Sequence, residues 1–399
     1  MKIAVVFFLF CAACYFTHRL YLAHFRKKAF SGLSYTVKVS HDERFGGETV
    51  SFSQTITNNR AYPIPCLKVE TTLPTGLWFL LPDGKEGERR STHVDSVFFL
   101  PAQSSVTRTW FLYCENRGEY QFGDVMLLTE EPFGMLSISE RMKGDARLRI
   151  LPRPEEKLCG FALQDFYQSS HSRSKGFLPE RSLVRSTREY TASDTFRDIH
   201  FKVSARQGKL MVKEYDHQKT DIYNVILNMQ SRIMEPHGGL TISRPDHIED
   251  CIRICASLLD SAAAEQVPIT LYANTRSEEE GALFCSGDFC GQDELPAAYR
   301  MLAAIPMEMS MQTEKMLDLI LSDPGVYARG GKLAFVSAYL DRRMLQFAEN
   351  MQKHGVETAF FITTTYQNDE SIPEKGVTVY VRYPSGDYRE VYHEANRAT

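Results

Sequence analysis

Residues 188–215 read REYTASDTFRDIHFKVSARQGKLMVKEY, and this stretch decides where the carboxyl-terminal part of the fold begins. Apolar residues recur at helical spacing from Phe196 to Val203, and Asp194 can cap the first turn. Gly208 can adopt the left-handed backbone conformation that commonly ends a helix. We therefore predict a helix from about Thr195 to Gln207, followed by a short strand after Gly208.

The same stretch carries a high density of opposite charges, for which two interpretations are open. In the first, Asp194 and Asp198 neutralise Arg188, Arg197 and Arg206 in a buried network, because an unpaired buried charge costs several kcal/mol. In the second, some of these arginines face outward and recognise another protein through paired guanidinium contacts. The two interpretations are compatible with each other.

The pattern of this stretch resembles the bacterial proteins classed as domain of unknown function 58. The matching positions are Arg188, Tyr190, Asp194, Arg197, Ile199, His200, Lys202, Ser204, Ala205, Arg206, Gly208, Leu210, Val212, Lys213 and Glu214. Two positions depart from the family pattern, Ser193 for glycine and Phe201 for tryptophan. The segments from Arg117 to Gly123 and from Glu131 to Met135 also resemble the family.

The resemblance implies a non-enzymatic adaptor or assembly factor that works with a MoxR-type AAA+ ATPase or its clients, and it implies no cofactor. The residues expected to bind the partner or to hold the motif together are Arg188, Tyr190, Asp194, Arg197, His200, Lys202, Ser204 and Arg206. Two alternatives remain. One is an enzyme that uses Asp194, His200 and Arg206 as acid, base and anion clamp, and the other is an extracellular adhesion module.

Short apolar runs and amphipathic segments alternate after the motif, and this alternation predicts a doubly wound α/β domain over residues 188–399. The expected strands are Val225–Met229, Val267–Tyr272, Lys332–Ala338 and Glu357–Thr363. The expected helices are His247–Ala264, Asp293–Ala304, Thr313–Ser322 and Arg342–His354. The family resemblance implies a von Willebrand factor type A-like domain here.

Domains of that type often bind a divalent cation through a D-x-S-x-S sequence at the end of the first strand. This chain has Asn228, Gln230 and Arg232 at those positions, and Ser337 where a later aspartate is expected. Hard cations require oxygen ligands, preferably with a carboxylate, and an arginine opposes a cation on Coulomb grounds. We therefore expect no bound metal.

The part before the motif is predicted to be an antiparallel β-sandwich over residues 30–151 and a linker over residues 152–187. Apolar and polar residues alternate in Leu33–Val39, Val50–Ile56 and Leu67–Leu73, and turn signals such as Gly46-Gly47 lie between such runs. The complete expected fold class is α+β and multidomain, with an N-terminal transmembrane helix, the β-sandwich and the α/β domain.

Residues 1–29 are predicted to be a transmembrane anchor with a basic flank. Ile3 to Phe16 is an uninterrupted apolar run, and a helix from Ile3 to Phe25 would span about 34 Å, enough to cross a bilayer. A cleaved signal peptide is the competing interpretation. Basic residues follow the run, so the positive-inside rule predicts a single-pass protein of the cell membrane with most of the chain in the cytoplasm.

Composition and motifs exclude several other functions. The net charge of −4 gives no general reason to expect nucleic acid as a partner. The chain has no phosphate-binding G-x-x-x-x-G-K-[ST] loop, no G-x-S-x-G nucleophile elbow and no H-E-x-x-H pair. These absences argue against an enzyme that hydrolyses ATP, esters or peptides by these mechanisms.

Overall fold

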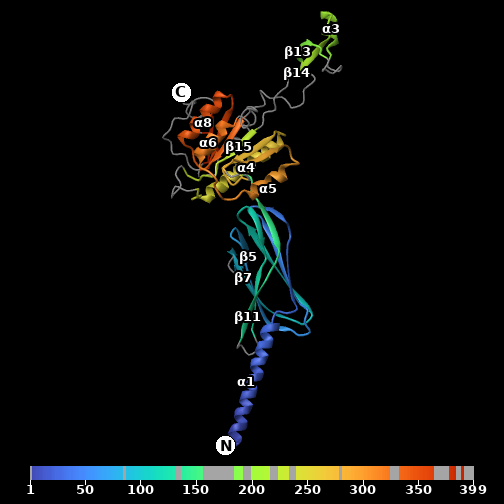
Figure 1. The fold of residues 1–399 in the computed structure, drawn as a ribbon, viewed down its shortest axis with the longest axis vertical. Coiled ribbons are helices and arrows are strands. Elements are labelled where there is room, and N and C mark those ends of the chain that lie inside the picture. The colour runs from blue at the N-terminus through green and yellow to red at the C-terminus, as the bar shows by residue number, and fades with distance from the viewer. Residues whose placement is uncertain are drawn as a thin grey trace. The chain divides into compact units, whose positions relative to one another are not determined.

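The computed structural model describes residues 2–83, 87–130, 136–155, 184–191, 199–215, 223–232, 240–277, 281–323, 332–363, 377–382 and 388–390 (Figure 1). The chain divides into two compact units, residues 1–153 and 154–399. Each unit has its own sheets and its own hydrophobic core.

The first unit begins with helix α1, Lys2–Lys28. No helix within the described residues is long and apolar enough to cross a membrane, so the predicted transmembrane anchor at residues 1–29 is wrong. The predicted single-pass membrane localisation is wrong for the same reason. The described side chains of α1 include Arg19, whose transfer to the centre of a bilayer would cost a free energy of about 3 kcal/mol. The last turn of the helix contains three more basic residues, Arg26, Lys27 and Lys28.

The rest of the first unit consists of three sheets. A five-stranded sheet has the order β1-β3-β8-β5-β6, a four-stranded sheet the order β11-β10-β4-β7, and a three-stranded sheet the order β2-β12-β9. All pairs are antiparallel except β2 with β12. The strands are β1 Leu33–Val39, β2 Glu43–Phe45, β3 Thr49–Asn58, β4 Ile64–Thr72, β5 Leu77–Asp83, β6 Gly87–Ser91, β7 His93–Leu100, β8 Ser104–Cys114, β9 Gly118–Phe122, β10 Val125–Glu130, β11 Ser137–Met142 and β12 Ala146–Leu151.

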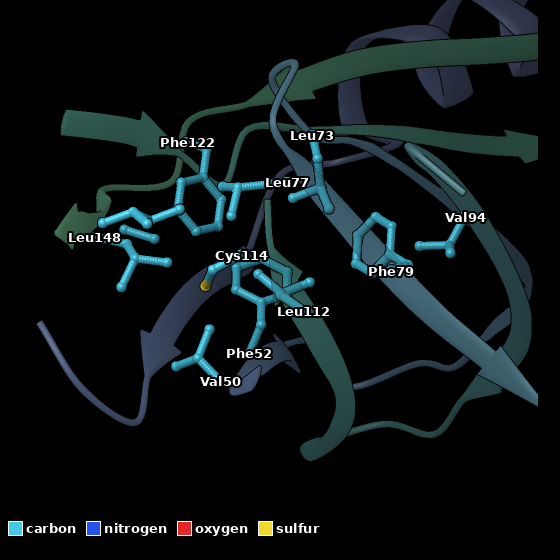
Figure 2. Close-up of a cluster of buried hydrophobic side chains, with 12 residues drawn as sticks. Val50, Phe52, Leu73, Leu77, Phe79, Val94, Leu112, Cys114, Phe122 and Leu148 are labelled. Carbon is cyan, nitrogen blue, oxygen red and sulfur yellow. The ribbon is translucent and has the colours of Figure 1, made fainter. Parts of the chain in front are cut away.

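The inward side chains of these sheets meet in two buried clusters, as in a β-sandwich. Phe52 of β3 packs within 5.5 Å of the Phe122 ring of β9 and within 6.3 Å of the Phe79 ring of β5, measured between ring centroids (Figure 2). The second cluster joins Ile56 of β3 to Leu67 of β4 and Leu127 of β10. Inward and outward side chains alternate along each strand, so that one face of each sheet is buried against the other sheets. The burial of these apolar faces holds the sheets together.

The second unit contains a seven-stranded sheet with the order β17-β16-β15-β18-β19-β20-β21. The five central strands run parallel, and β17 and β21 are antiparallel edge strands. The strands are β15 Tyr223–Leu227, β16 Ile269–Ala273, β17 Phe284–Phe289, β18 Lys332–Ser337, β19 Glu357–Ile362, β20 Val377–Arg382 and β21 Tyr388–Glu390. The helices between them are α4 Pro245–Ala264, α5 Leu295–Ala304, α6 Thr313–Ser322 and α8 Arg342–Lys353.

Hydrophobic patterning explains the central sheet. All described residues of β15 and β18 are buried, as expected for parallel strands that are covered on both faces. The four predicted strands and four predicted helices of this region are confirmed to within a few residues. The predicted fold class as a whole needs correction, because strand is the commonest structure among the described residues, with 42% strand and 28% helix, and the first helix does not span a membrane.

The second unit also contains a two-stranded sheet of β13, Val184–Glu189, and β14, Met211–Tyr215, with the short helix α3, Phe201–Gln207, between them in sequence (Figure 1). These elements contain the charged motif.

Candidate functional site

The charged motif folds as an antiparallel strand pair with a helix in the connection. Arg188 of β13 pairs with Val212 of β14, and the backbone N–H of Tyr190 continues the pairing with a hydrogen bond of 2.9 Å to the Leu210 carbonyl. Ile199 forms an isolated antiparallel bridge with Val212, and both side chains are buried. The apolar residues of the motif therefore fix the strand pair.

Helix α3 is held at both ends by side chains and backbone of the motif. The Nδ1 atom of His200, at the N-cap, accepts a hydrogen bond from the Val203 N–H at 3.4 Å. Gly208 ends the helix with a left-handed φ of 70°, which confirms the predicted stop. The Ser204 hydroxyl donates to the His200 carbonyl at 3.0 Å and accepts from the Met211 N–H at 2.8 Å, so it ties the helix to β14.

The outer face of α3 is uncovered. The helix has no buried residue, and Phe201 is 70% exposed. Lys202 and Arg206 lie exposed on the same short helix. An exposed aromatic ring on the same helix as an exposed arginine is a composition typical of protein recognition surfaces. We call Phe201, Lys202 and Arg206 the α3 face.

The structure separates the predicted motif residues into four groups. His200 and Ser204 are contacts that hold the motif together, whereas Lys202 and Arg206 are exposed. Tyr190 is half-buried beside the strand pair. The fourth group has no described side chain: Asp194 and Arg197 lie outside the described residues, as does the Arg188 side chain.

Two expectations about the motif change. The predicted Asp194 cap lies outside the described residues and stays a prediction. Ile199 is a bridge residue and the described helix begins at Phe201 with His200 as its cap, so the predicted continuous helix from Thr195 to Gln207 is wrong. The exposure of Arg206 contradicts its place in a buried charge network. A helix of only two turns leaves its outward face to solvent, and this was not evident from the apolar spacing.

A second cluster of polar residues lies at the carboxyl edge of the large sheet. Asn228 directly follows β15 and is completely buried. Its side-chain oxygen accepts hydrogen bonds from the Gln230 N–H at 3.1 Å and from the Asn274 side chain at 3.3 Å. Its amide nitrogen donates to the Ser337 hydroxyl, at the end of β18, at 3.1 Å. The Asn228 side chain therefore connects the carboxyl ends of three neighbouring strands, β16, β15 and β18.

Thr313 connects this cluster to the start of α6. Its hydroxyl lies 2.9 Å from the Asn228 oxygen, 2.8 Å from the Gln230 side-chain oxygen and 3.0 Å from the Tyr339 hydroxyl. Its backbone N–H also donates to the Gln230 oxygen at 3.0 Å. We call Asn228, Gln230, Asn274, Thr313, Ser337 and Tyr339 the carboxyl-edge network.

Sequence reasoning identified Asn228, Gln230 and Ser337 but missed Asn274, Thr313 and Tyr339. Asn274 follows a predicted strand, and Thr313 begins a predicted helix. Their positions next to element boundaries are the signal that could have identified them, because the carboxyl ends of parallel strands share one edge.

The donor set of this edge does not fit a hard divalent cation. The carboxyl-edge network consists of amides and hydroxyls, whereas such cations prefer carboxylate oxygens. Within the described residues, no group of three or more histidine, cysteine or acidic side chains could hold a metal. Arg232 is exposed, and its carbonyl accepts from the Gln230 amide at 2.7 Å. Asp341 caps α8 by accepting from the Met344 N–H at 2.9 Å.

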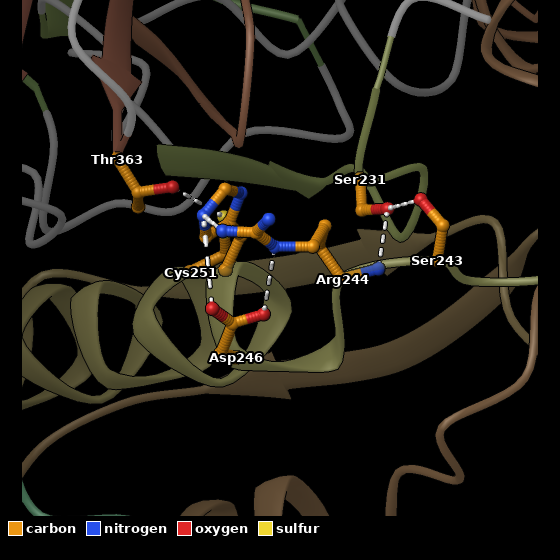
Figure 3. Close-up of polar contacts among 7 residues, drawn as sticks. Ser231, Ser243, Arg244, Asp246, Cys251 and Thr363 are labelled. Atoms are coloured by element: carbon orange, nitrogen blue, oxygen red, sulfur yellow. Dashed lines mark hydrogen bonds and ion pairs between the residues drawn. The ribbon is translucent and has the colours of Figure 1, made fainter. Parts of the chain in front are cut away.

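The start of α4 is attached to the same edge (Figure 3). The Ser231 hydroxyl, just after β15, accepts from the Arg244 N–H at 3.1 Å and lies 3.3 Å from the Ser243 hydroxyl. Farther along α4, the Cys251 sulfur lies 3.8 Å from the Thr363 hydroxyl at the end of β19. Burial raises the pKa of the Cys251 thiol to about 12, so this cysteine stays protonated at neutral pH.

The fold and these contacts define a two-unit protein with sandwich-like sheets and a mostly parallel α/β sheet. No protein-family model matches the chain. It is 23% identical over 219 residues to an uncharacterized Bacillus subtilis protein named YeaD, a match that covers 54% of this chain and 49% of that protein. The matched region therefore spans about half of the curated relative.

Two solved structures of other proteins resemble a part of the chain. The CARDB domain of a Pyrococcus furiosus protein, in complex with di-metal ions, has a TM-score of 0.20 and 11% identity over 30% of this chain and 91% of that domain. The sporulation control protein Spo0M of Bacillus subtilis has a TM-score of 0.20 and 12% identity over 34% of this chain and 56% of its own. These scores are too low to carry a functional argument.

Proposed function

We propose that this protein is a non-enzymatic adaptor that binds a protein partner through the α3 face. The observation that carries the proposal is that α3 buries no side chain while its two ends are fixed by His200, Ser204 and Gly208. A surface that is ordered before binding loses little conformational entropy on association. Phe201 and Arg206 supply the aromatic and guanidinium groups that often dominate interface energies.

The partner that we propose is a MoxR-type AAA+ ATPase or a protein on which it acts. This part of the proposal rests on the family resemblance of the motif. The positive charge of Lys202 and Arg206 favours an acidic patch on the partner, because opposite potentials steer association and fix its register.

The contacts of His200 support an adaptor over the enzyme alternative. Its Nδ1 atom faces the Val203 N–H at the helix cap, so one of its two nitrogens is committed to holding α3. In a neutral imidazole, an Nδ1 atom that accepts this bond leaves the ring proton on Nε2, so neither nitrogen is free to remove a proton from a substrate.

The proposal is tested with the full-length chain and a purified MoxR-type ATPase from the same organism. Binding is measured by biolayer interferometry with and without ATP. The double variant Lys202→Glu/Arg206→Glu is expected to weaken binding at least tenfold, because it replaces attraction by repulsion. Phe201→Ala is expected to weaken binding by a similar factor.

A matched control is the double variant Lys315→Glu/Arg342→Glu, which reverses two exposed basic residues on α6 and α8. Its affinity should equal that of the wild type. Circular dichroism checks that each variant is folded. Equal affinities for the α3 variants and the control would refute the role of the α3 face, and absence of wild-type binding would refute the proposed partner.

A further inference from the structure

A cavity of about 380 Å³ lies in the first unit, between the end of α1 and the strands β4 and β10. Its apolar wall includes Tyr21 and Phe25 of α1 and Ile64 of β4. Lys28 and Arg60 bring positive charge to it, and Glu130 brings one carboxylate. Its volume and mostly apolar lining are within the range of sites for small molecules.

The walls of this cavity are fixed before any ligand binds. Ala29 and Phe30, just after α1, are buried in the second core cluster of the sandwich. The loop that carries Arg60 is anchored by Asn58, whose completely buried side chain donates to the Tyr62 carbonyl at 3.0 Å and to the Pro101 carbonyl at 2.8 Å. A preformed cavity loses little free energy to reorganisation on binding.

The cations of the cavity retain donors for a ligand. Arg60 donates through Nε to the Ser31 carbonyl and through one Nη to the Ala29 carbonyl, and its guanidinium lies 5.5 Å from the centre of the Tyr62 ring. A guanidinium has five N–H donors, so these bonds orient Arg60 without exhausting it. The Lys28 ammonium has no hydrogen-bond or ion-pair partner among the described residues.

From this arrangement we infer that the cavity binds a small organic anion with an apolar body, of the size of a medium-chain fatty acid or an aromatic carboxylate. The anionic group lies against Lys28 and Arg60, which hold it by charge-assisted hydrogen bonds. The apolar body packs on Tyr21, Phe25 and Ile64. Glu130 opposes the anion and sets an upper limit on the affinity.

The site is tested with the full-length chain and the fluorescent anion 8-anilinonaphthalene-1-sulfonate. The expected result is saturable binding with one site per chain, displaced by decanoate and at least tenfold less well by decanol of the same chain length. Decanol that competes as well as decanoate would overturn the inference, because the cations would then have no role. Absence of saturable, decanoate-sensitive binding would also overturn it.

Three variants assign the binding to this cavity. Lys28→Gln should weaken binding of decanoate at least fivefold, whereas Glu130→Gln should strengthen it at least threefold. Lys27→Gln is the matched control, because Lys27 is the adjacent basic residue of α1 and does not line the cavity. Its affinity should stay within twofold of the wild type.

The gain expected of Glu130→Gln cannot come from a loss of folding, so it separates a ligand contact from a structural effect. Equal affinities of the Lys28→Gln and Lys27→Gln variants, or weaker binding by the Glu130→Gln variant, would overturn the inference.

Discussion

The Thr313 hydroxyl lies 2.9 Å from the side-chain oxygen of Asn228, although the two residues are 85 positions apart in the sequence. This contact joins the end of β15 to the start of α6. A hydroxyl has one proton and two lone pairs, so Thr313 donates to one oxygen at a time and accepts from Tyr339. The carboxyl edge of the sheet is thus closed by neutral groups that satisfy each other.

Replacing Thr313 by valine should therefore destabilise the second unit by about 2 kcal/mol, because the buried oxygens of Asn228 and Gln230 lose their shared donor. Urea unfolding followed by circular dichroism measures this loss. Thr241→Val is the control, since Thr241 is exposed, and it should change stability by less than about 0.5 kcal/mol. A loss below about 0.5 kcal/mol for Thr313→Val would show that the network contributes little.

Divalent cations should leave the thermal stability of the protein unchanged. The carboxyl-edge network has no carboxylate, and Asn228 turns an amide N–H toward Ser337. A cation present at 100 times its Kd would stabilise the folded state by about 2.7 kcal/mol, a shift of several degrees in Tm. Calorimetry with 5 mM Mg²⁺, 5 mM Mn²⁺ or EDTA checks this expectation, and a cation-dependent rise of several degrees that disappears in Asn228→Ala would contradict it.

Stability should decrease at alkaline pH through Cys251. Its pKa is raised from 9.0 to about 12, chiefly by burial, so the unfolded thiol loses its proton before the folded one. This contribution is complete below pH 9 and is lost as the pH rises from 9 to 12. Between pH 8 and pH 10 the wild type should lose about 1 kcal/mol more than Cys251→Ala.

The measurement is urea unfolding of both proteins at the two pH values. The difference between the two proteins cancels the contributions of other groups that titrate at alkaline pH. Alkylation with iodoacetamide at pH 8, mapped by mass spectrometry, provides a second test. The exposed Cys285 should react in the native protein and Cys251 only after unfolding. If the free energies of unfolding of the wild type and Cys251→Ala fell equally between pH 8 and pH 10, the alkaline loss of stability would not come from Cys251.

Ser204→Ala should loosen the junction between α3 and β14. The Met211 N–H donates to the Ser204 hydroxyl at 2.8 Å, and its side chain is buried, so the variant leaves a shielded donor unpaired. Hydrogen exchange of the Met211 amide should become at least tenfold faster. Ser322→Ala removes an exposed hydroxyl that donates to the Leu319 carbonyl at the end of α6, and it should leave exchange at Met211 unchanged.

Local patterns predicted the strands β15, β16, β18 and β19 and the helices α4, α5, α6 and α8, because the cause of each is local. Burial on both faces requires continuous apolar runs such as β18, and one-sided burial of helices requires the spacing seen in α8. Gly208 was identified as a helix stop because its positive φ disfavours other residues. The wrong transmembrane prediction has a local cause as well, because an apolar run was extended across Arg19.

The sequence by itself determined four strands and four helices of the second unit, the alternation that buries one face of β3, and the residues Asn228, Gln230 and Arg232 at the D-x-S-x-S positions. Only the tertiary structure decided which distant residues share a hydrogen bond, such as Thr313 with Asn228, and that Phe201 and Arg206 are exposed while Ser204 binds β14. Element type follows from periodicity within a few residues. A network at a sheet edge depends on strand order, which is set by the packing of the whole unit.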